Sequence, residues 1–132
     1  MSLIVTPFMR KTLALDAIVS GAAALLMIAG SSYLSLFLNL PAALLFWAGL
    51  VLAPFVALLV ALARLHAVSR LLLIDIIAVN GLWVATSFGL LASGAVIPNL
   101  WGNLFVAAQA LAVAAFAILQ TFALRQAPSV AV

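Results

Sequence analysis

The sequence has 132 residues, of which 70% are hydrophobic and only 5% are charged. Soluble domains carry about 25% charged residues, so this composition excludes an ordinary soluble domain and indicates a chain surrounded by lipid. The net charge of +3 comes from scattered residues, which gives no indication of nucleic acid as a partner, and the lack of cysteine excludes disulfides and cysteine-based metal sites.

Four hydrophobic stretches are long enough to cross a bilayer, which takes about 20 apolar residues per helix. The stretches lack the alternation of polar and apolar residues that marks a membrane β-barrel. The first exceeds the roughly 7–15 residues of a signal-peptide core, so we expect it to remain as a span. The sequence predicts an all-α fold, a four-helix transmembrane bundle forming one integral membrane domain over residues 1–132. The predicted helices are 13–38, 42–63, 71–93 and 100–124.

The few basic residues lie before the first predicted helix, between the second and third, and after the fourth. The other two connections, 39–41 and 94–99, carry no charge. The positive-inside rule therefore predicts that both termini and the middle connection are cytoplasmic. The basic residues are Arg10, Lys11, Arg64, Arg70 and Arg125.

The two halves of the chain share a pattern. Residues 11–16 resemble residues 70–75, and each half continues with a proline at its turn and then a tryptophan. A duplication would give two parallel two-helix repeats, related by an axis along the membrane normal. Leu and Ala also match by chance in so apolar a chain, so the duplication is left open.

The second predicted helix contains Gly49, Ala53, Ala57 and Ala61 at four-residue spacing. Such small residues let helix backbones approach closely, either within the bundle or between copies of the chain. Pro54 lies inside the same helix and predicts a kink, because it lacks an N–H and clashes with the preceding turn.

Asp16 and Asp75 are the only acidic residues, and each lies about a turn and a half inside the cytoplasmic end of its predicted helix. An acid at the centre of a membrane helix costs roughly 2.5–3.5 kcal/mol, so an intramembrane acid is a candidate functional group. One interpretation is an ion or proton site. The alternative is that each aspartate pairs with a nearby basic residue and holds helix ends together.

Polar residues also gather near the middle of the membrane. Asn80, Trp83 and Ser87 share one face of the third predicted helix, and Gln109 lies at a similar depth on the fourth, with Gln120 three turns later on the same face. This cluster predicts a binding site for a flat or amphipathic ligand such as a quinone or a lipid headgroup. The alternative is hydrogen bonding between helices, at about 0.6 kcal/mol per contact.

Three segments carry a resemblance to other proteins: Leu82-Trp83-Val84 after Asn80, residues 105–110, and Asp16-Ala17 with Ser20-Gly21. Together they resemble an uncharacterised family of small four-span bacterial inner-membrane proteins. The resemblance implies a bacterial inner membrane and no known activity.

His66 is the only histidine, so we expect no metal site and no cofactor. The sequence shows no nucleophile–base pair, so we expect no enzymatic activity. The main prediction is a structural or accessory membrane component that contacts the lipid bilayer and other membrane proteins or a second copy of itself. The alternative is a small carrier or binder of an amphipathic ligand or a cation.

Overall fold

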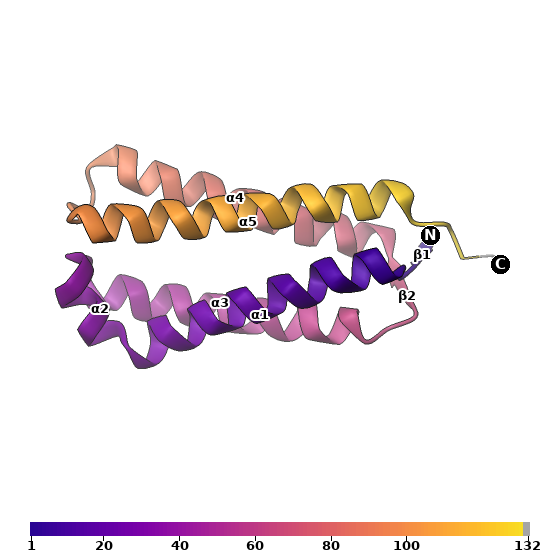
Figure 1. The fold of residues 1–132 in the computed structure, drawn as a ribbon, viewed down its shortest axis with the longest axis horizontal. Coiled ribbons are helices and arrows are strands. Elements are labelled where there is room, and N and C mark those ends of the chain that lie inside the picture. The colour runs from indigo at the N-terminus through magenta and orange to yellow at the C-terminus, as the bar shows by residue number, and fades with distance from the viewer. Residues whose placement is uncertain (131–132) are drawn as a thin grey trace.

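The computed structural model describes residues 1–130, which form five helices and one pair of short strands. Four long helices pack side by side, which confirms the predicted all-α four-helix bundle (Figure 1). The N- and C-terminal segments lie at one end, here named the terminal end, and α2 lies at the other, the turn end. The elements are β1 (Ser2–Ile4), α1 (Pro7–Ala29), α2 (Ser31–Leu38), α3 (Ala42–Ala63), β2 (Ala67–Ser69), α4 (Arg70–Ser93) and α5 (Leu100–Gln126).

The first long helix begins at Pro7, six residues before the predicted start at Leu13. The hydroxyl of Thr6 accepts a hydrogen bond from the backbone N–H of Met9 at 3.1 Å. Proline suits the first helical turn, where its missing N–H would have no partner within the helix. The prediction failed because it placed the charged residues outside the helix.

This earlier start changes the depth of the first acidic residue. Asp16 lies nine residues after Pro7, which corresponds to about 14 Å along the helix axis at 1.5 Å per residue. The predicted depth of a turn and a half was therefore too shallow, and Asp16 lies closer to the middle of the bundle.

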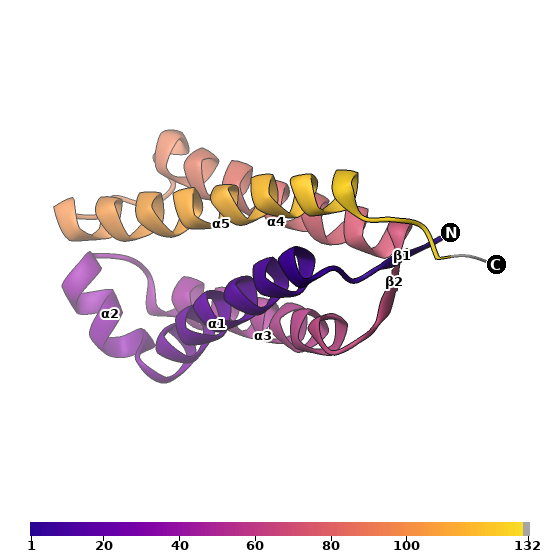
Figure 2. The same ribbon diagram turned by 45° about the vertical axis from the view of Figure 1, so that its right-hand side comes forward.

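The predicted single span 13–38 was also wrong at its other end, because the chain breaks at Gly30 into α1 and α2. A β-carbon at Gly30 would lie only 2.7 Å from the carbonyl oxygen of Leu26. Only glycine fits this bend without strain. Figure 2 shows α2 turned away from the axis of α1 and lying near the start of α5, which it contacts.

The long helices form two antiparallel hairpins, α1 with α3 and α4 with α5 (Figure 2). Between the hairpins, α5 packs against α1, whereas the backbones of α3 and α4 do not approach closely in the described residues and these two helices share only side chains of the buried core, such as Leu59 and Leu73. The first hairpin is close-packed at Gly49, where an added β-carbon would lie 2.8 Å from Cγ1 of Ile28 and 3.0 Å from the carbonyl oxygen of Ala24. The loose side of the bundle therefore lies between α3 and α4.

The small residues that recur every four positions in α3 lie on two different surfaces of the helix. Gly49 is buried against α1, whereas Ala53, Ala57 and Ala61 are exposed on the outside of the bundle. Residues four apart on a helix advance by about 40° per step, so the row turns away from α1. Pro54 lies within the same helix, which continues past it.

At the terminal end the two hairpins are joined by backbone pairing. Strands β1 and β2 pair antiparallel, with Leu3 opposite Val68, and a further bridge links Leu3 to Ser129. At the turn end, the Asn39 side chain donates to the carbonyl oxygen of Ile97 at 2.6 Å, and the Asn99 side chain donates to that of Phe37 at 2.7 Å.

Four helices, α1, α3, α4 and α5, are long and apolar enough to cross a membrane. The exposed surfaces of these helices carry large hydrophobic side chains such as Ile18, Leu25, Val51, Leu82 and Leu111. Such a surface is stable in hydrocarbon and costly in water. The chain is a multi-pass membrane protein.

Candidate functional site

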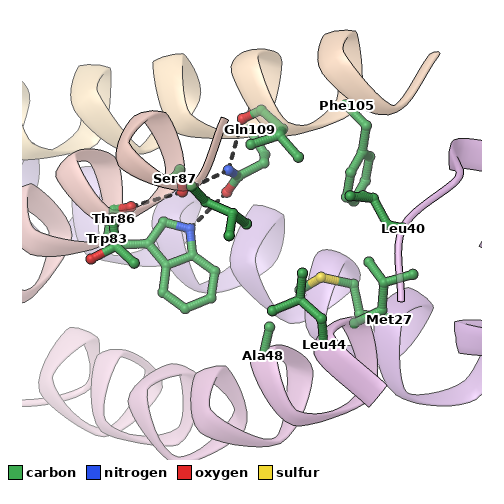
Figure 3. Close-up of a pocket in the computed structure, with 12 residues that line it drawn as sticks. Met27, Leu40, Leu44, Ala48, Trp83, Thr86, Ser87, Phe105 and Gln109 are labelled. Carbon is green, nitrogen blue, oxygen red and sulfur yellow. Dashed lines mark hydrogen bonds between the residues drawn. The ribbon is translucent and has the colours of Figure 1, made fainter. Parts of the chain in front are cut away.

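A cavity of about 160 Å³ lies between the two hairpins, on the side where α3 and α4 are apart. Its lining is almost entirely apolar and comes from all four long helices (Figure 3). We name it the lateral groove. The apolar lining residues include Met27, Leu44, Leu45, Ala48, Leu90 and Phe105.

Three polar side chains form one wall of the lateral groove. The Trp83 indole N–H donates to Oε1 of Gln109 at 2.7 Å. The Gln109 amide N–H₂ donates to Oγ of Ser87 at 3.1 Å and to the backbone carbonyl of Val106 at 2.8 Å. These bonds join α4 to α5 within one hairpin and hold the edge of the indole, so that the ring lies along the groove (Figure 3).

A second polar cluster lies nearer the terminal end and is fully enclosed. The Asp16 side chain is 0% exposed. One carboxylate oxygen, Oδ1, accepts from the Ser20 hydroxyl at 2.8 Å. The other, Oδ2, accepts from the side-chain amides of Asn80 at 2.9 Å and Gln120 at 2.7 Å. Asn80 also donates to Oε1 of Gln120 at 2.8 Å. We name these four residues the Asp16 cluster.

The Asp16 cluster differs from the groove wall because it crosses between the hairpins. Asp16 and Ser20 belong to α1, Asn80 belongs to α4, and Gln120 belongs to α5. The carboxylate receives three hydrogen bonds and no basic side chain reaches it within residues 1–130. The alternative that Asp16 pairs with a basic residue is therefore wrong. The groups that donate to its carboxylate are one hydroxyl and two amides, all of them neutral.

Trp83 lines two cavities. A smaller cavity of about 40 Å³ is lined by Trp83, Phe55, Ser20 and Asn80 among others. Trp83 also lines the lateral groove. The indole therefore separates the groove from the small cavity, and the small cavity borders the Ser20 side of the Asp16 cluster.

The predicted mid-membrane cluster is thus split in two. Trp83, Ser87 and Gln109 come together as predicted from their shared faces, whereas Asn80 joins Asp16 instead. Asn80 and Ser87 share a helix face but lie seven residues apart, or about 10 Å along the axis. Side chains at such different depths bind different partners.

The second acidic residue is placed differently from the first. Asp75 is exposed on α4, and no hydrogen bond or ion pair involves its side chain in the described part of the chain. The two aspartates hold matching positions in the two halves of the sequence, but their surroundings in the bundle differ, because Asp16 is buried and Asp75 is exposed.

Sequence reasoning did not predict the hydrogen bonds that two members of the cluster, Ser20 and Gln120, make to Asp16. Ser20 lies one turn after Asp16, and Gln120 lies on the same face of α5 as Gln109. The spacing of four residues between Asp16 and Ser20 was a usable signal, because such residues are neighbours on a helix. The contact with Gln120 joins residues 104 positions apart in the sequence, and helix periodicity alone does not predict which helices meet.

The basic residues lie at the helix ends, at the terminal end of the bundle. Arg10 makes two hydrogen bonds with its guanidinium, which donates to the carbonyl oxygen of Ala63 and, at 3.1 Å, to that of Leu65. Ala63 is the last residue of α3 and Leu65 lies two residues after it, where backbone acceptors lack helical partners. Arg10 therefore caps α3 across the first hairpin.

Comparison with protein-family models, with curated proteins and with solved structures found no match to this chain. The resemblance to small four-span bacterial proteins is therefore supported only at the level of architecture, as a small four-span membrane protein.

Proposed function

We propose that this membrane protein binds a small, flat, amphipathic molecule from the lipid phase in the lateral groove. The observation that carries the proposal is the apolar cavity of about 160 Å³ beside Trp83, Ser87 and Gln109. An apolar cavity of about 150 Å³ accommodates benzene in another protein. The groove is therefore large enough for a single ring, while a longer tail would lie along the lipid-facing surface.

The chemistry of the lining favours a planar ring. Trp83 and Phe105 present aromatic surfaces to the groove, and aromatic groups gain about 0.5–1.5 kcal/mol from offset or edge-to-face contact beyond the area that they bury. Thr86 lines the same groove and offers a hydroxyl donor to a ring carbonyl. A quinone-type headgroup combines these features.

The proposed activity is binding without chemical transformation. The lateral groove contains no acid, base or thiol among its described lining residues, and catalysis by proton transfer or nucleophilic attack requires such groups.

We further propose that the terminal end faces the cytoplasm, in a bacterial inner membrane. The bundle carries Arg10 and Arg70 at helix starts and Arg64 and Arg125 at helix ends, all at this end. Basic residues near span ends favour the cytoplasmic side.

A structural or accessory role is the second candidate. One observation favours it: in residues 1–130, every buried side-chain nitrogen and oxygen already has a hydrogen-bond partner. Under this alternative the polar clusters serve only to hold the helices together, as interhelical hydrogen bonds do in other membrane proteins.

The ligand proposal is tested by tryptophan fluorescence in lipid nanodiscs. A reporter carrying Trp47→Phe and Trp101→Phe keeps only Trp83, which lines the groove. We expect a short-chain benzoquinone to quench this reporter with a saturable dependence on concentration. A second reporter that keeps only Trp47, which is 63% exposed, is expected to show linear, collisional quenching.

A steric variant separates binding from general contact with lipid. Ala48→Phe places a ring in the lateral groove, whereas Ala53→Phe places one on the exposed outer surface of the same helix. We expect Ala48→Phe to abolish the saturable quenching of Trp83 and Ala53→Phe to preserve it. Linear quenching of both reporters would contradict the ligand proposal and favour the structural role.

A further inference from the structure

We propose that Asp16 is a reversible proton-binding site inside the membrane, and that the proton is carried on Oδ1, the carboxylate oxygen that faces Ser20. This inference stands independently of the ligand proposed for the lateral groove, because it depends on the Asp16 cluster alone. Three features of the cluster support it: the burial of the carboxylate, the directions of its hydrogen bonds, and the small cavity beside Ser20.

The hydrogen-bond directions select one oxygen of the carboxylate. Oδ2 faces two amide N–H donors, from Asn80 and Gln120, and an amide N–H₂ group has no acceptor with which to receive a proton. Oδ1 faces the hydroxyl of Ser20. A hydroxyl both donates and accepts, so the Ser20 hydroxyl can rotate and accept an Oδ1–H bond after the carboxylate takes up a proton.

The same directions disfavour a metal ion. Calcium takes six to eight oxygen ligands and magnesium about six, whereas two N–H groups already occupy the neighbourhood of Oδ2. In the described residues no group of three histidine, cysteine or acidic side chains gathers at any point. A proton needs only one oxygen and one hydrogen-bond acceptor, and the Asp16 cluster supplies both.

A small cavity next to Ser20 is the proposed source of the proton. Ser20 and Asn80 line the cavity of about 40 Å³, which exceeds the roughly 30 Å³ that one water molecule occupies in the liquid. A hydronium ion there would give a proton to the Ser20 hydroxyl oxygen while the Ser20 hydroxyl gives its own proton to Oδ1, leaving water in the cavity, an intact hydroxyl at Ser20 and a neutral carboxylic acid at Asp16. Trp83 closes this cavity toward the lateral groove.

Other charged groups are not in contact with Asp16. On α1 itself, Arg10 is engaged with the backbone at the end of α3, and Lys11 is exposed. The exposed charged residues on or next to the neighbouring helices are Arg64 after α3, Arg70 and Asp75 on α4, and Arg125 on α5. The neutral donors of the Asp16 cluster are therefore the groups that control its protonation.

Protonation changes the link between the hairpins. Hydrogen bonds to an ionised carboxylate are about twice as strong as those between neutral groups. Asp16 belongs to the first hairpin, and Asn80 and Gln120 belong to the second. Uptake of the proton therefore weakens the attraction between the hairpins at this depth.

The test uses the unusual composition of the chain. Asp16 and Asp75 are its only acidic side chains, so labelling the aspartate side-chain carboxyl with ¹³C by cell-free synthesis gives two signals. In Asp75→Asn only the Asp16 signal remains. We expect this signal to shift with pH, in nanodiscs, as a single reversible titration that is independent of sodium concentration.

Two glutamine variants provide the matched comparison, each made in the Asp75→Asn background. Gln120→Leu removes a donor to Oδ2, so we expect the pH response of the Asp16 signal to differ from that of the parent protein. Gln109→Leu removes the other mid-membrane glutamine, which does not contact Asp16, and is expected to leave it unchanged. An Asp16 signal that does not shift with pH while the bundle stays folded would overturn the proposal. A pH response of the signal that depends on sodium concentration, or that changes equally in Gln120→Leu and Gln109→Leu, would also overturn it.

Discussion

At the residue scale, the bundle distinguishes side chains that look alike in the sequence. Asp16 and Asp75 hold similar positions in the two halves of the chain, yet only Asp16 is buried and hydrogen-bonded. Gln109 and Gln120 share a helix face, yet one supports Trp83 and the other supports Asp16. Depth along the helix decides these partners, because each polar group binds the donor or acceptor at its own level.

The two aspartates give the first prediction at this scale. Asp16→Asn places an N–H₂ group where the carboxylate accepts hydrogen bonds, so we expect the free energy of unfolding to fall by about 1–3 kcal/mol. Asp75→Asn, at an exposed position without partners among residues 1–130, is expected to change it by less than about 0.5 kcal/mol. Thermal unfolding in one detergent compares the two, and equal losses would contradict the assignment of Asp16 to the cluster.

The glycines give the second residue-scale prediction. A β-carbon at Gly102 would overlap the carbonyl oxygen of Leu38 and lie 2.6 Å from Cβ of Pro98. We expect Gly102→Ala to reduce stability by about 1–3 kcal/mol, because the backbone cannot move away cheaply.

Gly81→Ala is the matched control for Gly102→Ala. Gly81 lies inside α4 with nothing within 4 Å of an added β-carbon, so alanine there should be neutral or stabilising by up to about 1 kcal/mol. The same unfolding assay measures both variants. A Gly102→Ala protein as stable as Gly81→Ala would show that α5 does not approach Leu38 so closely.

At the element scale, the helix ends are held by contacts that cross to another element. Arg10 on α1 caps α3, and Asn99 caps the start of α5 by accepting from Gly102 at 2.8 Å while donating to Phe37. Such contacts satisfy backbone groups that a helix end leaves unpaired. In a membrane protein they also fix where each helix leaves the lipid.

The cap at the end of α3 is open to test. Arg10→Met keeps a long side chain but removes both hydrogen bonds to the carbonyls of Ala63 and Leu65, so we expect a loss of about 1–2 kcal/mol in unfolding free energy. Lys11→Met removes the neighbouring charge from an exposed position and is expected to have little effect. Equal effects of the two substitutions would mean that charge, rather than capping, is what Arg10 contributes.

The sequence predicted some helix bounds and missed others for physical reasons. The range 42–63 matches α3, because Pro41 and Arg64 mark its two ends. The start of α1 was missed because Arg10 and Lys11 were assigned to a loop, and the break at Gly30 was missed because the hydrophobic run continues across it. Strands β1 and β2 have three residues each and depend on pairing between distant segments, which no local pattern reveals.

The contacts within the candidate site were also predicted only in part. The shared helix faces predicted that Trp83 and Ser87 lie together, and similar depth predicted that Gln109 joins them. The Asp16 cluster was not predicted, because it needs the relative rotation and depth of three helices. These follow from close packing at positions such as Gly49 and from the joined ends of the bundle, and neither leaves a periodic signal.

At the scale of the whole molecule, two tight hairpins are joined at three levels. Strand pairing joins them at the terminal end, the Asp16 cluster joins them inside the membrane, and Asn39 and Asn99 join them at the turn end. Between these links, α3 and α4 stay apart and the lateral groove lies open along the side. This arrangement leaves a bundle that is joined at both ends and has a groove along one side, which is where we propose that a lipid-soluble molecule binds.

The central claim is that the four long helices cross the membrane, with the α3–α4 link and the α4–α5 turn on opposite sides. The chain has no cysteine, so His66→Cys in the link and Ala95→Cys in the turn, both at exposed positions, each introduce a single thiol. Labelling with a membrane-impermeant maleimide on sealed vesicles of known orientation measures the side of each. Labelling of one thiol from the outside, and of the other only after the vesicles are opened, is the expected result. Labelling of both thiols from the same side of intact vesicles would contradict the four-span bundle.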